Sequence, residues 1–73
     1  MFGENVKFYR KKKNLSQTKL AELVGVHASM IGLIESCGKV PNVLLGAKIA
    51  KTLGVTLDKL INGEEVKDLE PKD

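Results

Sequence analysis

The sequence predicts an all-α protein, with one compact domain of five short helices followed by an acidic tail. Glycine and asparagine residues divide residues 1–63 into short segments rich in Leu, Ala, Lys and Glu. These residue types favour helix, and no segment shows the two-residue alternation of apolar and polar side chains that is typical of strands. A chain of 73 residues is also too short for more than one hydrophobic core.

Apolar spacing and capping residues place each helix along the chain. We expect the first helix over residues 4–12 and the third over residues 28–36, each with an apolar stripe at three- and four-residue spacing. In the fourth helix, either Leu44 or Leu45 should be buried. The other three helices each lie between a polar N-cap residue and a glycine: Ser16 and Gly25, Asn42 and Gly54, and Thr56 and Gly63.

The net charge of +3 is distributed unevenly along the chain. Residues 1–63 carry ten Lys and Arg against four Asp and Glu, which is a net charge of +6. Residues 64–73 carry two Lys against five Asp and Glu, which is −3. We therefore expect residues 1–63 to form the domain and residues 64–73 to be a solvated, flexible acidic tail.

Composition excludes several functional classes. One cysteine, Cys37, permits neither an intramolecular disulfide nor a multi-thiolate metal site, and its spacing from His27 matches no metal motif. No paired carboxylates, nucleophile with a base, or phosphate-cradling glycine loop is present, so we expect no enzyme activity, no cofactor and no metal. No apolar run is long enough to span a bilayer and no leader opens the chain, which predicts a soluble, cytoplasmic protein.

Residues 17–35 carry the most informative pattern, two short helices that meet at a sharp turn. Ala21 is small where the helices must approach closely, and Gly25 supplies the turn. These constraints at fixed offsets are typical of a helix-turn-helix. The apolar residues of the shared core are Leu20, Val24, Val26, Ile31 and Ile34.

On these residues, the sequence resembles the Cro/repressor-type helix-turn-helix domains, also called lambda-repressor-like or xenobiotic response element domains. The matching positions are residues 15–17, 20–21, 24–26, 31, 34–35, 41 and 50–55. The resemblance covers residues 4–62 and implies a compact all-helical fold that binds double-stranded DNA as a homodimer. It also implies that Arg10 and Glu35 form a buried, structural ion pair.

The resemblance implies DNA contacts from the start of the second helix, from the third helix and from the loop after it. Gln17 matches a phosphate-contacting position, and the third helix should enter the major groove. Lys39 is the preferred phosphate contact of the loop. The residues aligned with or beside base contacts are His27, Ala28, Ser29, Met30, Gly32 and Leu33, and those of the loop are Ser36, Lys39 and Asn42.

The third helix differs from most members of this family, which have polar side chains at the base-contacting positions. It contains no Arg, Gln or Asn, so bidentate contacts to guanine or adenine are missing. Ser29 can hydrogen-bond a base edge, while Ala28, Met30 or Leu33 can pack on a thymine methyl group. We expect readout by methyl contact and DNA shape, with weak intrinsic specificity.

The sequence leaves two interpretations open for His27, and two for the lysines at the end of the first helix. His27 is either a poor helix cap or a phosphate contact that strengthens when the ring is protonated. The run from Lys11 to Lys13 is either a solvated helix end or a second flank for the DNA backbone.

The last helix is the dimer interface that the resemblance implies, through Leu57, Leu60 and Ile61, although Leu57 and Leu60 should also belong in part to the core. The leading hypothesis is a small repressor or controller that binds a palindromic operator as a homodimer. A phage repressor, a restriction-modification controller and an antitoxin fit equally well. The alternative is a protein-interaction module or antitoxin-type partner protein that uses the apolar face of the third helix, where Ala28, Met30 and Leu33 lie.

Overall fold

The computed structural model describes residues 2–63, and within that range it contains five α-helices and no β-strand. The acidic tail predicted at residues 64–73 lies outside the described residues. No helix between residues 2 and 63 is long and apolar enough to cross a membrane. The predicted all-α fold is confirmed, with helices α1 (Phe2–Lys12), α2 (Gln17–Val24), α3 (Ala28–Ser36), α4 (Val43–Leu53) and α5 (Leu57–Asn62).

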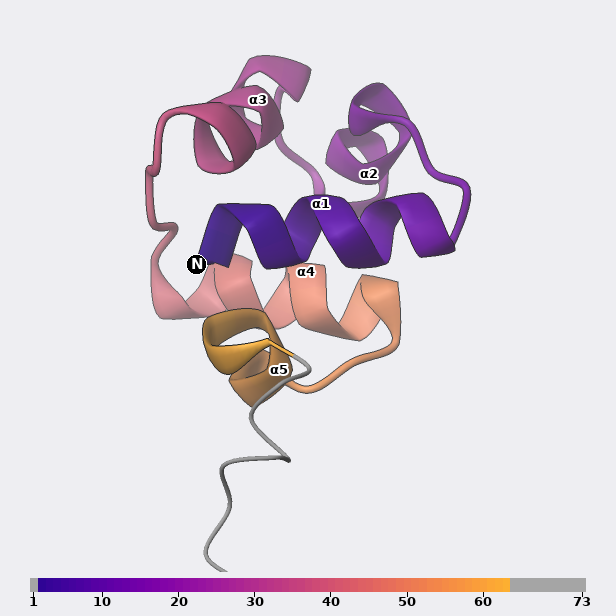
Figure 1. Ribbon diagram of the computed structural model, residues 1–73. Coiled ribbons are helices and arrows are strands. Elements are labelled where there is room, and N and C mark those ends of the chain that lie inside the picture. The colour runs from indigo at the N-terminus through magenta and orange to yellow at the C-terminus, as the bar shows by residue number, and fades with distance from the viewer. Residues whose placement is uncertain (1, 64–73) are drawn as a thin grey trace, which may run out of the picture.

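The helices surround a single core to which each of them contributes. In Figure 1, α1 crosses the middle of the molecule, with α2 and α3 above it and α4 and α5 below it. The packing of α3 on α1, and of α1 on α5, places the helix-turn-helix and the last helix on opposite sides of α1. The largest fully buried side chains are Val6, Leu20, Ile31, Ile34, Ile49, Leu53 and Leu60.

The predicted caps define three helix starts and two helix ends. The hydroxyl of Ser16 accepts from Lys19 N at 2.9 Å, and the hydroxyl of Thr56 accepts from Lys59 N at 3.1 Å. Asn42 Oδ1 accepts from Leu45 N at 2.9 Å in the same way. After α2 and α4, Gly25 and Gly54 take the left-handed conformation, with φ of 79° and 75°. Local chemistry therefore sets these boundaries.

The first helix begins two residues earlier than predicted, at Phe2 instead of Glu4. The reason is tertiary packing, because Gly3 is buried and a Cβ on it would overlap the carbonyl oxygen of Ile34. Asn5 Nδ2 also donates to the carbonyl oxygen of Leu60 at 2.7 Å, which ties the first turns of α1 to α5. The start of α1 is therefore held between α3 and α5.

Two predictions about apolar side chains are decided by the packing. Of the two candidates in α4, Leu45 is half-buried and Leu44 is 78% exposed. Leu60, predicted in the dimer interface, is fully buried in the core and cannot contact a second subunit. Its side chain is enclosed because α5 packs on both α1 and α4.

We predict opposite effects of alanine at two helical glycines. Gly3→Ala should lower the free energy of unfolding by about 1–3 kcal/mol, because its methyl group must displace the α3 backbone. At Gly32 the nearest atom to a new Cβ is Gln17 Oε1 at 3.9 Å, so Gly32→Ala should raise stability by about 0.5–1 kcal/mol through helix propensity. Urea unfolding followed by circular dichroism measures both. A Gly3→Ala protein as stable as the parent would contradict the close approach.

Candidate nucleic-acid interface

A buried ion pair joins α1 to α3, as the family resemblance implies. Arg10 Nε donates to Glu35 Oε2 at 2.7 Å, and Arg10 Nη2 donates to Glu35 Oε1 at 2.9 Å. The two side chains are only 8% and 1% exposed. Because a charge that is buried without its partner is costly, this bidentate pair fixes one position of α3 on α1.

The same pair also positions the start of α2. Gln17 Nε2 donates to Glu35 Oε1 at 3.0 Å, and Arg10 Nη1 donates to the carbonyl oxygen of Leu15 at 2.7 Å. Gln17, the phosphate contact that the resemblance implies, therefore lies beside α3. One of the two hydrogens on its amide nitrogen is used in this bond, so the other can still donate to a phosphate oxygen.

The pair alters the pKa of both of its members. Burial by itself raises the pKa of the Glu35 carboxyl. Hydrogen bonds from Arg10 and Gln17, together with the positive charges of Arg10 and Lys7, lower it by more. The pKa of Glu35 therefore lies below its ordinary value of 4.5. The hydrogen bonds to Glu35 and its charge raise the pKa of Arg10, against the opposing effect of burial. Both groups are therefore charged throughout the physiological pH range.

The outward face of α3 is narrower than predicted. Ser29, Leu33 and Ser36 are exposed, at a spacing that places them on one side of the helix. Gly32 lies between them, half-buried and next to Gln17. Ala28 and Met30, in contrast, are half-buried and pack against the core. The methyl-contact role predicted for Ala28 and Met30 is therefore less favoured than that of Leu33.

His27 is the N-cap of α3, which is one of the two interpretations left open by the sequence. Its Nδ1 accepts from Ser29 N at 3.4 Å and lies 3.2 Å from Ser29 Oγ. This cap is long compared with the 2.9 Å bond made by Ser16. The ring is exposed, and because Nδ1 makes the cap, Nε2 remains for an external acceptor.

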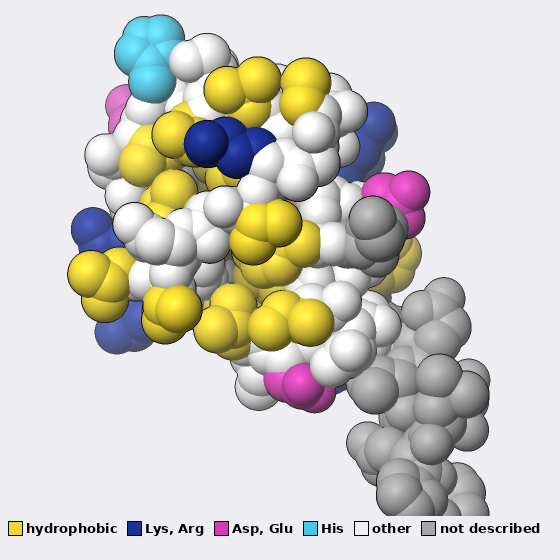
Figure 2. All heavy atoms as spheres, turned by 90° about the vertical axis from the view of Figure 1, so that its left-hand side faces the viewer, with side chains coloured by type: hydrophobic (Ala, Val, Ile, Leu, Met, Phe, Trp, Pro, Cys, Tyr) yellow, Lys and Arg dark blue, Asp and Glu magenta, His cyan; other side chains and the backbone are white. Residues whose placement is uncertain are grey.

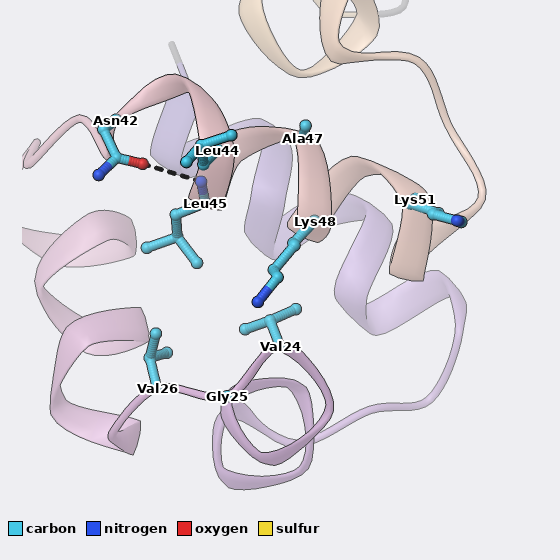
Figure 3. A pocket seen from close by; sticks show the side chains of 9 residues that line it. All are labelled: Val24, Gly25, Val26, Asn42, Leu44, Leu45, Ala47, Lys48 and Lys51. Carbon is cyan, nitrogen blue, oxygen red and sulfur yellow. Dashed lines mark hydrogen bonds between the residues drawn. The ribbon is translucent and has the colours of Figure 1, made fainter.

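The loop after α3 presents polar groups at the same edge of the domain. Cys37 N and Lys39 N both hydrogen-bond to the carbonyl oxygen of Leu33, at 2.9 and 3.3 Å, which turns the chain sharply. The side chain of Lys39 is exposed, as a phosphate contact requires. Asn42 uses Oδ1 to cap α4, and Figure 3 shows its amide nitrogen pointing away from that helix. Asn42 can therefore cap α4 through Oδ1 and donate to a phosphate oxygen through Nδ2 at the same time.

The basic run at the end of α1 lies away from α3. The ammonium group of Lys12 lies over the rings of Phe8 and Tyr9, 5.1 and 6.0 Å from their centroids. The side chain of Lys13 lies against Gly54, in the turn between α4 and α5. These positions do not favour the interpretation in which Lys12 and Lys13 flank DNA that is bound by α3.

The sequence did not predict a groove between α2 and α4 or the exposed apolar residues near it. The groove has a volume of about 580 Å³, with Val24, Val26 and Leu45 on its walls and Lys48 and Lys51 at its edge (Figure 3). The one signal in the sequence was the apolar residues on both sides of Pro41 and Asn42. Within residues 2–63, no three His, Cys, Asp or Glu side chains are placed to hold a metal ion.

Comparison with known proteins agrees with this geometry. The sequence model described as Helix-turn-helix matches residues 6–60, so the chain belongs to this lambda-repressor-like helix-turn-helix family. The control protein C.SmaI of Serratia marcescens is 40% identical over 70 residues, which cover 93% of this chain and 81% of that protein.

Solved structures of the same fold include complexes with DNA. The P22 c2 repressor with a synthetic operator superposes with a TM-score of 0.82 and 30% identity, over 88% of this chain and 97% of that chain. The biofilm regulator SinR in complex with DNA superposes with a TM-score of 0.78 and 34% identity, over 84% and 98%. SinR is also similar to this chain in its complex with the SinI protein, with a TM-score of 0.79 and 30% identity, over 99% and 69%.

We predict that Arg10→Ala lowers the free energy of unfolding by about 3–5 kcal/mol, because it leaves the Glu35 carboxylate buried without its cation. Arg10→Lys should cost less, since the charge stays and only the bidentate geometry is lost. Lys11→Ala, which removes an exposed cation one residue along the same helix, is the control and should change stability by about 0.5 kcal/mol or less. Equal stability of the Arg10→Ala and Lys11→Ala proteins would show that the pair is not structural.

We also predict a loss of stability in acid that depends on Glu35. Its pKa in the folded state lies below the ordinary value of 4.5, so its contribution is complete above that pH and is lost as the pH falls through the folded-state pKa. Melting temperatures measured from about pH 7 to pH 3 at constant ionic strength should fall more steeply below about pH 4.5 in the parent than in Glu35→Gln. Parallel acid profiles for the two proteins would contradict this assignment.

Proposed function

We propose that this chain is a non-enzymatic transcriptional regulator that acts in the cytoplasm and binds a palindromic DNA operator as a homodimer. The observation that carries the proposal is the exposed face of α3, which is fixed beside Gln17 by the buried Arg10–Glu35 pair. The DNA complexes of SinR and the P22 c2 repressor, which share this fold, support the DNA-binding part of the proposal.

The residues on and around the α3 face divide into those that position the domain and those that read the bases. Gln17, Ser36, Lys39 and Asn42 surround the α3 face with donors that suit phosphate oxygens. On the face itself, Ser29 offers a hydroxyl to a base edge, Leu33 offers an apolar surface to a thymine methyl, and Gly32 permits close approach. Direct readout by so few groups is weak, so DNA shape and the pairing of two half-sites supply much of the specificity.

The homodimer proposal rests on an exposed apolar face next to α5. Val40, Val43 and Leu44 are 70%, 73% and 78% exposed, and Ile61 is 55% exposed. A Cβ on Gly46 would contact Leu57, so α4 and α5 meet there; Val43 lies one turn before that contact and Ile61 one turn after it. We define Val40, Val43, Leu44 and Ile61 as the apolar face.

Figures 1 and 2 support pairing through this side of the molecule. The loop between α3 and α4 lies at the left in Figure 1, beside the first turn of α1. Figure 2 looks at that side and shows hydrophobic side chains spread across it. Monomeric proteins rarely leave large contiguous apolar patches exposed, which favours a partner there. In our proposal, that partner is a second copy of the chain. Of the interface residues that the sequence predicted, the proposal retains Ile61 and the half-buried Leu57.

The alternative, a protein-interaction module that uses the apolar face of α3, is less favoured. Leu33 is the only large exposed hydrophobic residue of α3, because Ala28 and Met30 pack against the core. The SinR–SinI complex shows that a relative of this chain binds a protein partner. Our proposal therefore includes a protein partner that regulates this chain.

We predict that Lys39→Ala weakens binding to all DNA sequences about equally and lowers the slope of log affinity against log salt by about one. Ser29→Ala, in contrast, should change the preference among sites more than the overall affinity, because a base contact is lost. Fluorescence anisotropy with operator and non-operator duplexes, titrated between about 50 and 200 mM salt, separates the two effects. If Lys39→Ala altered the site preference and left the salt slope unchanged, the assignment of Lys39 to the phosphate backbone would be wrong.

Selection of bound sites from random DNA tests the proposal as a whole. We expect a palindrome with half-sites about 34–36 Å apart, or about 10–10.5 base pairs. Ile61→Glu should weaken binding to the full site and leave binding to a single half-site unchanged. Leu23→Glu is the matched control, since Leu23 is 52% exposed but lies on α2. No binding at low salt to any selected site would reject DNA recognition, and equal effects of the two variants would reject this dimer face.

A further inference from the structure

Lysine side chains from distant parts of the chain surround a second hollow, on the side of the molecule away from the α3 face. It lies between the end of α1 and the turn that joins α4 to α5, and its volume is about 530 Å³. None of the described residues that line it is acidic. We call it the basic hollow, and its lining includes Tyr9, Lys12, Lys13, Asn14, Val55 and Lys59.

Two lysines of the basic hollow, Lys13 and Lys59, form no ion pair with the described part of the chain. The described acidic residues Glu22 and Glu35 pair with Lys19 and Arg10 elsewhere. The ammonium group of Lys13 lies against Gly54, and the half-buried Lys59 is part of the lining of the hollow. A hollow with one sign of charge concentrates its field and favours an anionic ligand.

The chain itself supplies an anionic segment, which follows α5 and therefore Lys59 closely in the sequence. Residues 64–73 contain Glu64, Glu65, Asp68, Glu70 and Asp73, and their net charge is −3. Lys59 lies four residues before Gly63, which is about 6 Å along a helix axis, and ten extended residues reach as far as about 33–36 Å. The segment therefore has both the charge and the length to cover the hollow.

We propose that residues 64–73 dock in the basic hollow of the same chain, with their carboxylates facing Lys13 and Lys59. The groove between α2 and α4 suits them less, because its walls are apolar and the segment has only Val66 and Leu69 as apolar side chains. A short tether supplies an effective concentration of about millimolar, so weak individual ion pairs suffice. Once docked, the segment shields these lysines from other polyanions.

A spin label in the full-length chain tests the docking directly. The label is attached to Pro71→Cys in a Cys37→Ser background, where Cys37 is an exposed residue. The readout is the broadening of backbone amide signals of residues 12–14, which are remote from the label in sequence, compared with residues 24–26 and 44–48. We expect clearly stronger broadening at residues 12–14. It should vanish near 1 M salt, where the screening length falls to about 3 Å.

Matched charge variants identify the docking site. Lys13→Gln with Lys59→Gln should lower the ratio of docked to undocked chain by about two- to thirtyfold, the combined effect of two exposed ion pairs. Lys48→Gln with Lys51→Gln removes the same charge beside the α2–α4 groove and should leave the broadening unchanged. Equal broadening of all three regions, stronger broadening at the groove, or no response to the Lys13 and Lys59 changes would overturn the proposal. So would broadening that arises only between labelled and unlabelled copies in a mixed sample.

Discussion

The bidentate pair between Arg10 and Glu35 is the interaction on which the placement of the helix-turn-helix depends. Its carboxylate also accepts from Gln17, and its guanidinium also donates to the carbonyl oxygen of Leu15, so α1, α3 and the start of α2 meet at one polar centre. Neither charge can move away without leaving the other buried and unpaired, which is far more costly than a lost surface contact. The close approach of Gly3 to the backbone of α3 strengthens the same constraint. The α3 face is consequently carried by a rigid support.

The surface around this support is divided into three regions of different chemistry. The α3 face is small, with the hydroxyl groups of Ser29 and Ser36, the exposed apolar side chain of Leu33, and Gly32 next to Gln17. The apolar face lies next to α5, and the basic hollow lies between the end of α1 and the α4–α5 turn. Five helices in so short a chain leave no room for a separate regulatory domain within residues 2–63. In our proposals, these three regions contact DNA, a second copy of the chain and residues 64–73, respectively.

Much of the fold was predictable because local chemistry defines it. The bounds of α3 agree with the prediction, and Ser16, Asn42 and Thr56 cap the helices that they were expected to cap. Side-chain roles were less predictable where apolar periodicity was the only evidence. Met30 is apolar and next to the turn, and whether it faces DNA or the core depends on how α3 is rotated against its neighbours. For the same reason, Leu60 was assigned in part to an interface although α1 and α4 enclose it.

The sequence by itself determined the helices, their caps, the helix-turn-helix spacing and the sign of the charge on each part of the chain. These properties follow from residues near one another along the chain, where backbone hydrogen bonding and local apolar spacing act. Only the tertiary structure decided that Gln17 shares the carboxylate of Glu35, that Leu44 is exposed while Leu45 is half-buried, and that Lys13 and Lys59 line the same hollow. Such pairings join residues far apart in the chain, and they depend on how close-packed helices exclude or admit each side chain.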